Sequence, residues 1–298
     1  MWRRYAAHVL IVFNPAAGAG RRRLARALAA LVTHGLRPDV AETRGPGDAE
    51  ILARDAARRG VMLVVAAGGD GTIAEVASGL AGSAAALGVL PLGTANVLAW
   101  ELGVPASPER AAAALAAGRS AMLHPGLARF AGGRQRLFVQ MLGAGFDAAV
   151  VARLDLALKR RIGRAAYVWQ SLRELPRYPF APITAELDGA SGTAASVIVT
   201  KGRLYAGRYC VAPAARPAEP GFQVVLFRHP GMARAALAAA ALPLGLIPRL
   251  PGVEILSARH IRLSAAAINV PVQADGDPAG LLPAEVTDAA GPLRILLP

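Results

Sequence analysis

The sequence Gly68-Gly69-Asp70-Gly71-Thr72 follows the apolar run Val61–Ala67 and precedes Ile73–Leu80, whose apolar spacing predicts a helix. A strand, a glycine turn and a helix in this order place backbone N–H groups and the positive end of a helix dipole where a phosphate can bind. Asp70 adds a carboxylate where phosphate-bound Mg²⁺ needs one. The stretch matches neither the dinucleotide fingerprint nor the lysine-containing P-loop. The alternative is a plain strand-to-helix turn, but an Asp and a Thr among three glycines favour a phosphate-binding loop.

The residues around this loop alternate between predicted strands and predicted helices. Such alternation predicts an α/β domain with a parallel, helix-covered sheet. The strands are expected at Val9–Phe13, Pro38–Thr43, Val61–Ala67 and Ala86–Leu90, and the helices at Arg21–Thr33, Asp48–Arg59, Ile73–Leu80 and, capped by Ser107, up to Ala117.

Three turns follow strands of this predicted sheet, namely Asn14–Gly18, Gly68–Thr72 and Leu92–Asn96. In an open α/β sheet such turns meet at the carboxyl edge, where ligands bind. Thr43, Thr72 and Thr94 each supply a hydroxyl at or near this edge. Any one of them alone is better explained as a helix or turn cap. Their occurrence after successive strands favours a nucleotide cleft.

The pattern changes near Met122, after which short strands separated by Gly and Pro predominate. This pattern predicts an antiparallel β-sandwich domain. We expect a hairpin at Phe130–Leu142, a glycine turn at Gly143–Phe146, helices at Asp147–Leu158, Arg164–Leu175 and Met232–Leu242, and strands at Ile183–Leu187, Ser196–Thr200, Val224–Phe227, Ile261–Leu263, Ile268–Gln273 and Leu293–Leu297. The predicted domains are therefore residues 1–125, which bind nucleotide, and residues 126–298, which bind the acceptor, with the last strand free to return to the first domain.

Composition limits the partners and the compartment. The chain has 298 residues, is 54% hydrophobic and carries a formal charge of +13, which favours anionic partners. No aromatic and basic RNA-binding module is present, so nucleic acid is not an expected partner. The single cysteine, Cys210, excludes an internal disulfide and is typical of a reducing cytosol. The longest apolar stretch, Ala235–Pro248, is too short to span a bilayer, so any membrane association is expected to be peripheral.

A second acidic motif, Asp275-Gly276-Asp277, follows the expected strand near the C-terminus. Phosphoryl transfer needs a base close to the acceptor hydroxyl, and Asp277 would serve if the β domain folded over the nucleotide cleft. An ordinary Asp-Gly hairpin turn is the simpler interpretation of the same residues.

Taken together, these motifs resemble the diacylglycerol kinase catalytic-domain superfamily, which includes bacterial lipid kinases and sphingosine kinases. The matching residues run in family order over nearly the whole chain: Asn14-Pro15-x-x-Gly18, Thr43, Gly68-Gly69-Asp70-Gly71-Thr72 with Glu75-Val76, Pro91-Leu92-Gly93-Thr94-Ala95-Asn96, Gly143-x-Gly145-Phe146-Asp147 and Asp275-Gly276-Asp277.

The resemblance implies an ATP-dependent lipid kinase with ATP and Mg²⁺ between an α/β domain and a β-sandwich. It implies that Asp70 organises Mg²⁺ and takes part in catalysis, and that Asp277 is the general base, where the family usually has Glu. The implied nucleotide contacts are Asn14, Pro15, Gly18, Thr43, Gly68, Gly69, Asp70, Gly71, Thr72, Glu75, Thr94 and Asn96.

The chain departs from the family pattern at three places. Val97 and the segment His124-Pro125-Gly126 stand where many bacterial members have acidic residues that support the metal. Glu219-Pro220-Gly221 replaces a metal-binding loop, so no structural ion is expected there. These departures keep open a catalytically weakened nucleotide- or lipid-binding protein. An NAD kinase-like enzyme is a further alternative, because it shares the glycine turn.

The acceptor side is less defined by the sequence. A diacylglycerol-like lipid alcohol is the implied acceptor, and the basic run Lys159–Arg164 is interpreted either as a contact for anionic lipid headgroups or as a solvated helix end. Trp100 and Trp169 are expected in the core or a pocket wall. The oligomeric state is left open, with a homodimer as one option.

Overall fold

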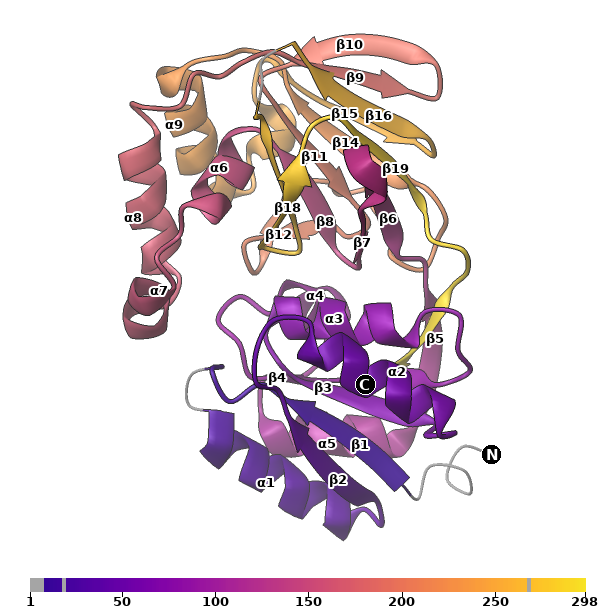
Figure 1. Cartoon of the computed structure of the whole chain (residues 1–298). Coiled ribbons are helices and arrows are strands. Elements are labelled where there is room, and N and C mark those ends of the chain that lie inside the picture. The colour runs from indigo at the N-terminus through magenta and orange to yellow at the C-terminus, as the bar shows by residue number, and fades with distance from the viewer. Residues whose placement is uncertain (1–7, 18–19, 267–268) are drawn as a thin grey trace. The chain divides into compact units, whose positions relative to one another are not determined.

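The computed structural model describes residues 8–17, 20–266 and 269–298 (Figure 1). The chain forms two compact units. The first contains the described residues up to His124 together with Ala290–Pro298, and the second contains Pro125–Ala289. The final strand, β20 (Leu293–Leu297), therefore belongs to the first unit, where it pairs in parallel with β4 (Ala86–Pro91) and antiparallel with β5 (Arg119–Leu123).

The first unit is an α/β fold with a largely parallel sheet in the order β2-β1-β3-β4-β20-β5. Every residue of β3 and β4 is buried, as expected for central strands covered on both faces. Besides β20, the strands of this unit are β1 (His8–Phe13), β2 (Arg37–Glu42), β3 (Leu63–Gly68), β4 (Ala86–Pro91) and β5 (Arg119–Leu123). Its helices are α1 (Gly20–Thr33), α2 (Asp48–Arg58), α3 (Asp70–Leu80), α4 (Val97–Glu101) and α5 (Pro108–Ala117). Ser107 caps α5, as predicted, by accepting from Arg110 N.

The second unit is a sandwich of two antiparallel sheets, in the orders β10-β9-β16-β19-β6-β7 and β15-β14-β11-β8-β17-β18. Apolar side chains from both sheets, among them Phe138, Leu142, Val224 and Ile261, form one buried core. The strands of the first sheet are β6 (Gly126–Phe130), β7 (Gln135–Phe138), β9 (Ile183–Leu187), β10 (Ala190–Ala194), β16 (Ile261–Ala265) and β19 (Ala284–Asp288). Those of the second are β8 (Met141–Ala144), β11 (Ser196–Thr200), β14 (Phe222–Phe227), β15 (Val253–Ala258), β17 (Pro271–Ala274) and β18 (Asp277–Leu281).

The helices of this unit are α6 (Phe146–Ala152), α7 (Leu156–Ile162), α8 (Ala165–Glu174) and α9 (Met232–Ala241), and a small hairpin joins β12 (Leu204–Tyr205) to β13 (Tyr209–Cys210). In the described part of the chain, no helix combines the length and hydropathy that a membrane span requires.

Three expected elements of the second unit were wrong. The hairpin is formed by β6 and β7, and the chain then crosses to the other sheet, so Phe130–Leu142 is not one hairpin. Gly143 lies inside β8 rather than in a turn. The expected helix Asp147–Leu158 is two helices, because Asp155 caps a new one by accepting from Ala157 N and Leu158 N. The expected strand Ile268–Gln273 begins outside the described residues, and β17 starts at Pro271.

Gly79 lets helices α2 and α3 approach each other. A Cβ at this position would lie 2.3 Å from Glu50 O and 2.8 Å from Ala53 Cβ. We expect Gly79→Ala to lower the free energy of unfolding by about 2 kcal/mol through overpacking, although Gly→Ala in a helix otherwise stabilises by about 1 kcal/mol. Denaturant unfolding measures the change. Gly45→Ala, where a Cβ meets nothing within 4 Å, is the matched control, and equal stability of the two variants would contradict the prediction.

Candidate active site

The carboxyl ends of the parallel strands are tied together by hydrogen bonds. Asn14, which follows β1, donates from its backbone N to Ala67 O in β3 at 3.0 Å and from Nδ2 to Thr72 Oγ1 at 3.1 Å. Thr43, which follows β2, donates from its backbone N to Phe13 O at 2.9 Å. The turns that were predicted to meet at this edge are thus brought together by direct contacts.

Two glycine turns pack backbone against backbone at the same edge. A Cβ on Gly93 would lie 2.3 Å from Gly69 Cα, and a Cβ on Gly68 would lie 2.4 Å from Thr72 Oγ1. Leu92 N and Gly93 N both donate to Gly68 O, at 2.9 and 3.0 Å. The two turns therefore lie in direct backbone contact next to the N-terminus of α3, a favourable place for an anion.

Asp70 is the first residue of α3, and its carboxylate also holds the start of α4. Its Oδ1 accepts from Val97 N at 2.6 Å. Burial raises the pKa of Asp70, while backbone donors at the start of α4 act in the opposite direction. The position that carries Val97 therefore contributes a backbone N–H to Asp70, which sequence reasoning did not foresee.

Asn96 closes the third turn in a left-handed conformation, with φ of 50°. Its Nδ2 donates to Gly93 O at 2.8 Å, and this bond holds the turn against the glycines. Among the described groups, Asn96 Oδ1 is buried without a hydrogen-bond partner. A buried acceptor of this kind can receive a hydrogen bond from a ligand at the edge.

The other predicted contacts of the first unit differ in what they do. Glu75 accepts from Gly47 N at 2.9 Å and Ala49 N at 3.2 Å, so both of its oxygens hold the start of α2. Thr94 is exposed, Pro15 lies in the turn after β1, and Gly71 is in the first turn of α3. Gly18 lies outside the described residues. Nucleotide contacts by these residues stay predictions.

The motif Asp275-Gly276-Asp277 belongs to the second unit, where it joins β17 to β18 as a hairpin. Asp275 and Gly276 have φ of 51° and 84°, as a two-residue Asp-Gly turn requires. The simpler interpretation of this motif is therefore confirmed. Asp277 lies just outside this two-residue turn, as the first residue of β18, and its role as a general base stays a prediction.

Asp275 anchors this turn from inside the protein. Its buried carboxylate accepts from Val139 N at 2.7 Å and from Gln140 N and Met141 N at 2.9 Å. These donors lie where the chain passes from β7 to β8, so the turn and that crossing are held as one structure. Asp277 is consequently presented from a fixed backbone.

Asp277 itself faces two basic side chains. Its Oδ2 lies 3.6 Å from Arg136 Nη2, and its side chain is 43% exposed. Burial raises the pKa of Asp277, and the charges of Arg136 and Lys159 partly offset this effect. A carboxylate with a raised pKa that still reaches solvent can accept a proton from an acceptor hydroxyl.

Asp147, at the start of α6, is an acidic group to which sequence reasoning gave no role. It accepts from Ala148 N at 2.8 Å and from Gln273 Nε2 at 3.2 Å. Burial raises the pKa of Asp147 to about 6. The pKa values of Tyr178, at about 12, and Tyr205 are raised by burial and then by the charge of Asp147. The signal in the sequence was an Asp directly after Gly145-Phe146, in a segment that was otherwise apolar.

Magnesium coordination by Asp70 stays a prediction. Across residues 8–17, 20–266 and 269–298, no group of three His, Cys, Asp or Glu side chains converges to hold a metal. Mg²⁺ on nucleotide phosphates commonly takes one or two carboxylates, with phosphate and water oxygens completing the shell. Asp70, beside the glycine backbone, fits that requirement.

Two family models match the chain in succession. The diacylglycerol kinase catalytic domain matches residues 8–127. The YegS C-terminal NAD kinase beta sandwich-like domain matches residues 140–297. Together they span both structural units.

Curated relatives and solved structures are similar over most of their length. A protein named "Probable lipid kinase YegS-like" from Stenotrophomonas maltophilia is 31% identical over 89% of this chain and 88% of its own. A diacylglycerol kinase from Mycobacterium tuberculosis is 28% identical over 97% and 95%. A crystal structure of a diacylglycerol kinase from Bacillus anthracis, 19% identical, superposes with a TM-score of 0.72 over 98% of this chain and 97% of that chain. A second structure from that organism reaches 0.80 at 21% identity, covering 98% and 95%.

The raised pKa of Asp147 predicts a pH-dependent stability. Because the folded pKa of about 6 exceeds the ordinary value of 3.8, protonated Asp147 favours folding, and this contribution is lost as the pH rises through about 6. We expect Asp147→Asn to gain on the order of 2 kcal/mol relative to wild type between about pH 4 and pH 7. Urea unfolding at both pH values measures the gain, with Glu186→Gln as an exposed control in the same unit. Parallel pH profiles for wild type and Asp147→Asn would contradict this assignment.

Proposed function

Because the chain belongs to the diacylglycerol kinase-like superfamily, a family of lipid kinases, we propose that it transfers the γ-phosphate of ATP to the hydroxyl of a diacylglycerol-like lipid. The observation that carries this proposal is the backbone contact between Gly69 and Gly93 at the N-terminus of α3. This arrangement suits a triphosphate, since it places glycine turns at the positive end of a helix.

In this proposal the residues of the first unit bind and orient the nucleotide. Asn14 and Thr72 present polar groups next to the glycine backbone, and Asn96 offers its buried oxygen. Asp70 would hold Mg²⁺, which supplies charge neutralisation on the phosphates when bound. The hydrogen bond from Val97 N to Asp70 fixes the carboxylate, so its orientation does not depend on the metal alone.

Asp277 serves as the base in the same proposal. It would accept the proton of the lipid hydroxyl as that oxygen forms its bond to the γ-phosphorus, while ADP leaves. Arg136, which lies on β7 of the other sheet, pairs with the Asp277 carboxylate. An Asp here reaches one methylene less far than the usual Glu, so the acceptor oxygen has to approach the β17–β18 turn closely. An ATP-using enzyme of this kind belongs in the cytoplasm.

We expect Asp70→Asn and Asp277→Asn each to lower phosphate transfer by about 100-fold or more. The fold should persist, because an Asn at position 70 keeps an oxygen for Val97 N, and the partly exposed Asp277 side chain lies 3.6 Å from its ion-pair partner Arg136. The assay uses γ-labelled ATP with diacylglycerol, NAD or a total lipid extract, followed by identification of the labelled product. Thermal unfolding is measured in parallel.

Asp39→Asn and Glu186→Gln are matched controls, since both replace exposed carboxylates, one in each unit. Full activity in either active-site variant removes that residue from the mechanism. Labelled NAD in place of a labelled lipid would identify a nicotinamide nucleotide kinase. ATP binding without transfer to any lipid would leave a nucleotide-binding protein instead.

We further propose that the second unit docks on an anionic membrane through α8. The polar side chains of this helix face inward and its apolar side chains face outward. Gln170 and Glu174 are buried. Val168, Trp169 and Leu172 are 62%, 52% and 61% exposed. The expected burial of Trp169 was therefore wrong. An apolar stripe that faces outward, with polar groups inside, is favourable where the outer medium is itself apolar.

Basic and further apolar side chains surround this stripe. Exposed residues on α7 and at both ends of α8 are Leu156, Arg161, Ile162, Arg164, Arg173 and Arg177, and α7 packs on α8 (Figure 1). The basic run expected at a helix end lies largely within α7. Each basic residue near an anionic surface contributes about 1 kcal/mol of attraction. Charge complementarity thus favours an anionic bilayer as the occupant of this face.

The double variant Trp169→Ser/Leu172→Ser should reduce binding to phosphatidylglycerol vesicles by roughly tenfold or more, because two apolar side chains lose their burial. Vesicle co-sedimentation measures the loss, and Val32→Ser/Ile51→Ser, at exposed apolar positions of the first unit, is the control. Wild-type binding by the α8 variant would contradict the proposal. The proposal would also be contradicted if neither wild type nor the variant bound vesicles and wild type formed a homodimer that dissociates in the variant.

A further inference from the structure

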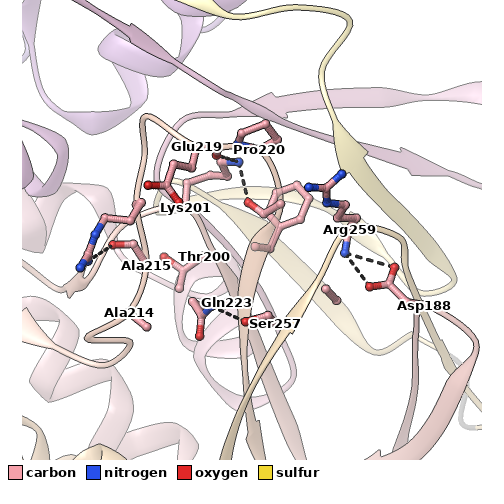
Figure 2. Close-up of a pocket in the computed structure, with 14 residues that line it drawn as sticks. Asp188, Thr200, Lys201, Ala214, Ala215, Glu219, Pro220, Gln223, Ser257 and Arg259 are labelled. Atoms are coloured by element: carbon pink, nitrogen blue, oxygen red, sulfur yellow. Dashed lines mark hydrogen bonds between the residues drawn. The ribbon is translucent and has the colours of Figure 1, made fainter.

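Lys201 is buried with its ammonium among oxygen atoms (Figure 2). Its side chain is 0% exposed, and Nζ donates to Glu219 O at 3.0 Å, Gly221 O at 2.6 Å and Asp288 Oδ1 at 2.8 Å. The ring of Phe222 lies 4.6 Å from the same nitrogen. Two carbonyls, a carboxylate and an aromatic face thus surround one positive charge.

These oxygens come from separate parts of the sandwich. Lys201 directly follows β11, Glu219 and Gly221 precede β14, and Asp288 ends β19 of the other sheet. Asp288 Oδ2 also accepts from Gly221 N at 2.7 Å. The ammonium therefore joins the two sheets, close to the residue at which the chain leaves this unit, Ala289.

The donor set is of the kind that binds hard cations. Backbone carbonyls and a carboxylate are typical ligands of Ca²⁺ and related ions. Without a cation, these three oxygens would face one another in a partly buried site, where an acceptor without a partner is costly. Burial lowers the pKa of Lys201, and Asp288 acts in the opposite direction, so the oxygens are what keep the charge acceptable there.

We propose that Glu219 O, Gly221 O and the Asp288 carboxylate form a cation site whose built-in occupant is the Lys201 ammonium. Removal of the ammonium converts this site into one that binds a free hard cation or a small alkylammonium ion. A cavity of about 310 Å³ borders the site and is lined in part by Lys201, Glu219 and Gly221, which gives such ions a path from solvent. The site is separate from the residues assigned to phosphate transfer.

The test is chemical rescue of Lys201→Ala in the full-length protein. We expect this variant to unfold roughly 5 °C or more below wild type. Millimolar CaCl₂ or n-propylammonium chloride should recover at least half of that loss, whereas n-propanol and tetramethylammonium chloride should not. Wild type should not respond to any of these additions. Rescue should disappear in Lys201→Ala/Asp288→Asn, because the carboxylate is then absent.

A folded Lys201→Ala that neither cation stabilises would overturn the proposal. If Lys201→Ala is unfolded without additions, recovery of a cooperative transition with the cations supports it. If it is unfolded with them as well, Lys201→Met decides, since it keeps most of the side-chain volume without the charge. Stability of Lys201→Met equal to wild type shows that the oxygens need no cation and overturns the proposal. A loss that is strongly non-additive with Asp288→Asn supports it.

Discussion

The contact between Gly69 and Gly93 places two turns of the first unit backbone against backbone, and most of the candidate nucleotide site follows from it. A side chain at position 93 would overlap Gly69 Cα, so this approach requires glycine. Because the turns touch, Asp70 reaches the start of α4 and accepts from Val97 N. The same contact brings the turn after β4 to the N-terminus of α3. The placement of α4 and the layout of the proposed phosphate site thus have one structural cause.

In the second unit, buried polar groups rather than glycine contacts hold the turns in place. The Asp275 carboxylate accepts hydrogen bonds from three backbone N–H groups where the chain passes from β7 to β8. These bonds fix the turn that presents Asp277. Lys201 joins the two sheets at another end through carbonyls and Asp288. In both cases a charge is retained in the interior because several backbone groups compensate it. Asp275 and Asp277, two residues apart in the sequence, therefore lie in different environments, the first buried among backbone donors and the second partly exposed beside Arg136.

The fold class and the elements of the first unit were predictable, because apolar runs, glycine turns and caps act locally. The strands β3 and β4 and the Ser107 cap are of this kind. The errors fell in the second unit, where the chain changes sheets after Phe138 and helices restart at Asp155. Register between distant strands is set by packing, which a single sequence does not display. The sequence predicted that the turns containing Asn14 and Thr72 would lie at one edge of the sheet, but it did not predict the hydrogen bond between these two residues or the partners of Asp70 and Glu75.

Helix α8 shows why periodicity alone could not place its faces. An apolar stripe at helical spacing predicts which residues share a face, but not whether that face points inward. In α8 the buried face carries Glu174, which pairs with Arg153 at the end of α6, and the apolar face is left outside. The ion pair compensates the buried Glu174 carboxylate, so α8 holds a charge on its inner face while its apolar residues stay exposed. This inverted arrangement is the observation from which the proposed membrane docking is argued.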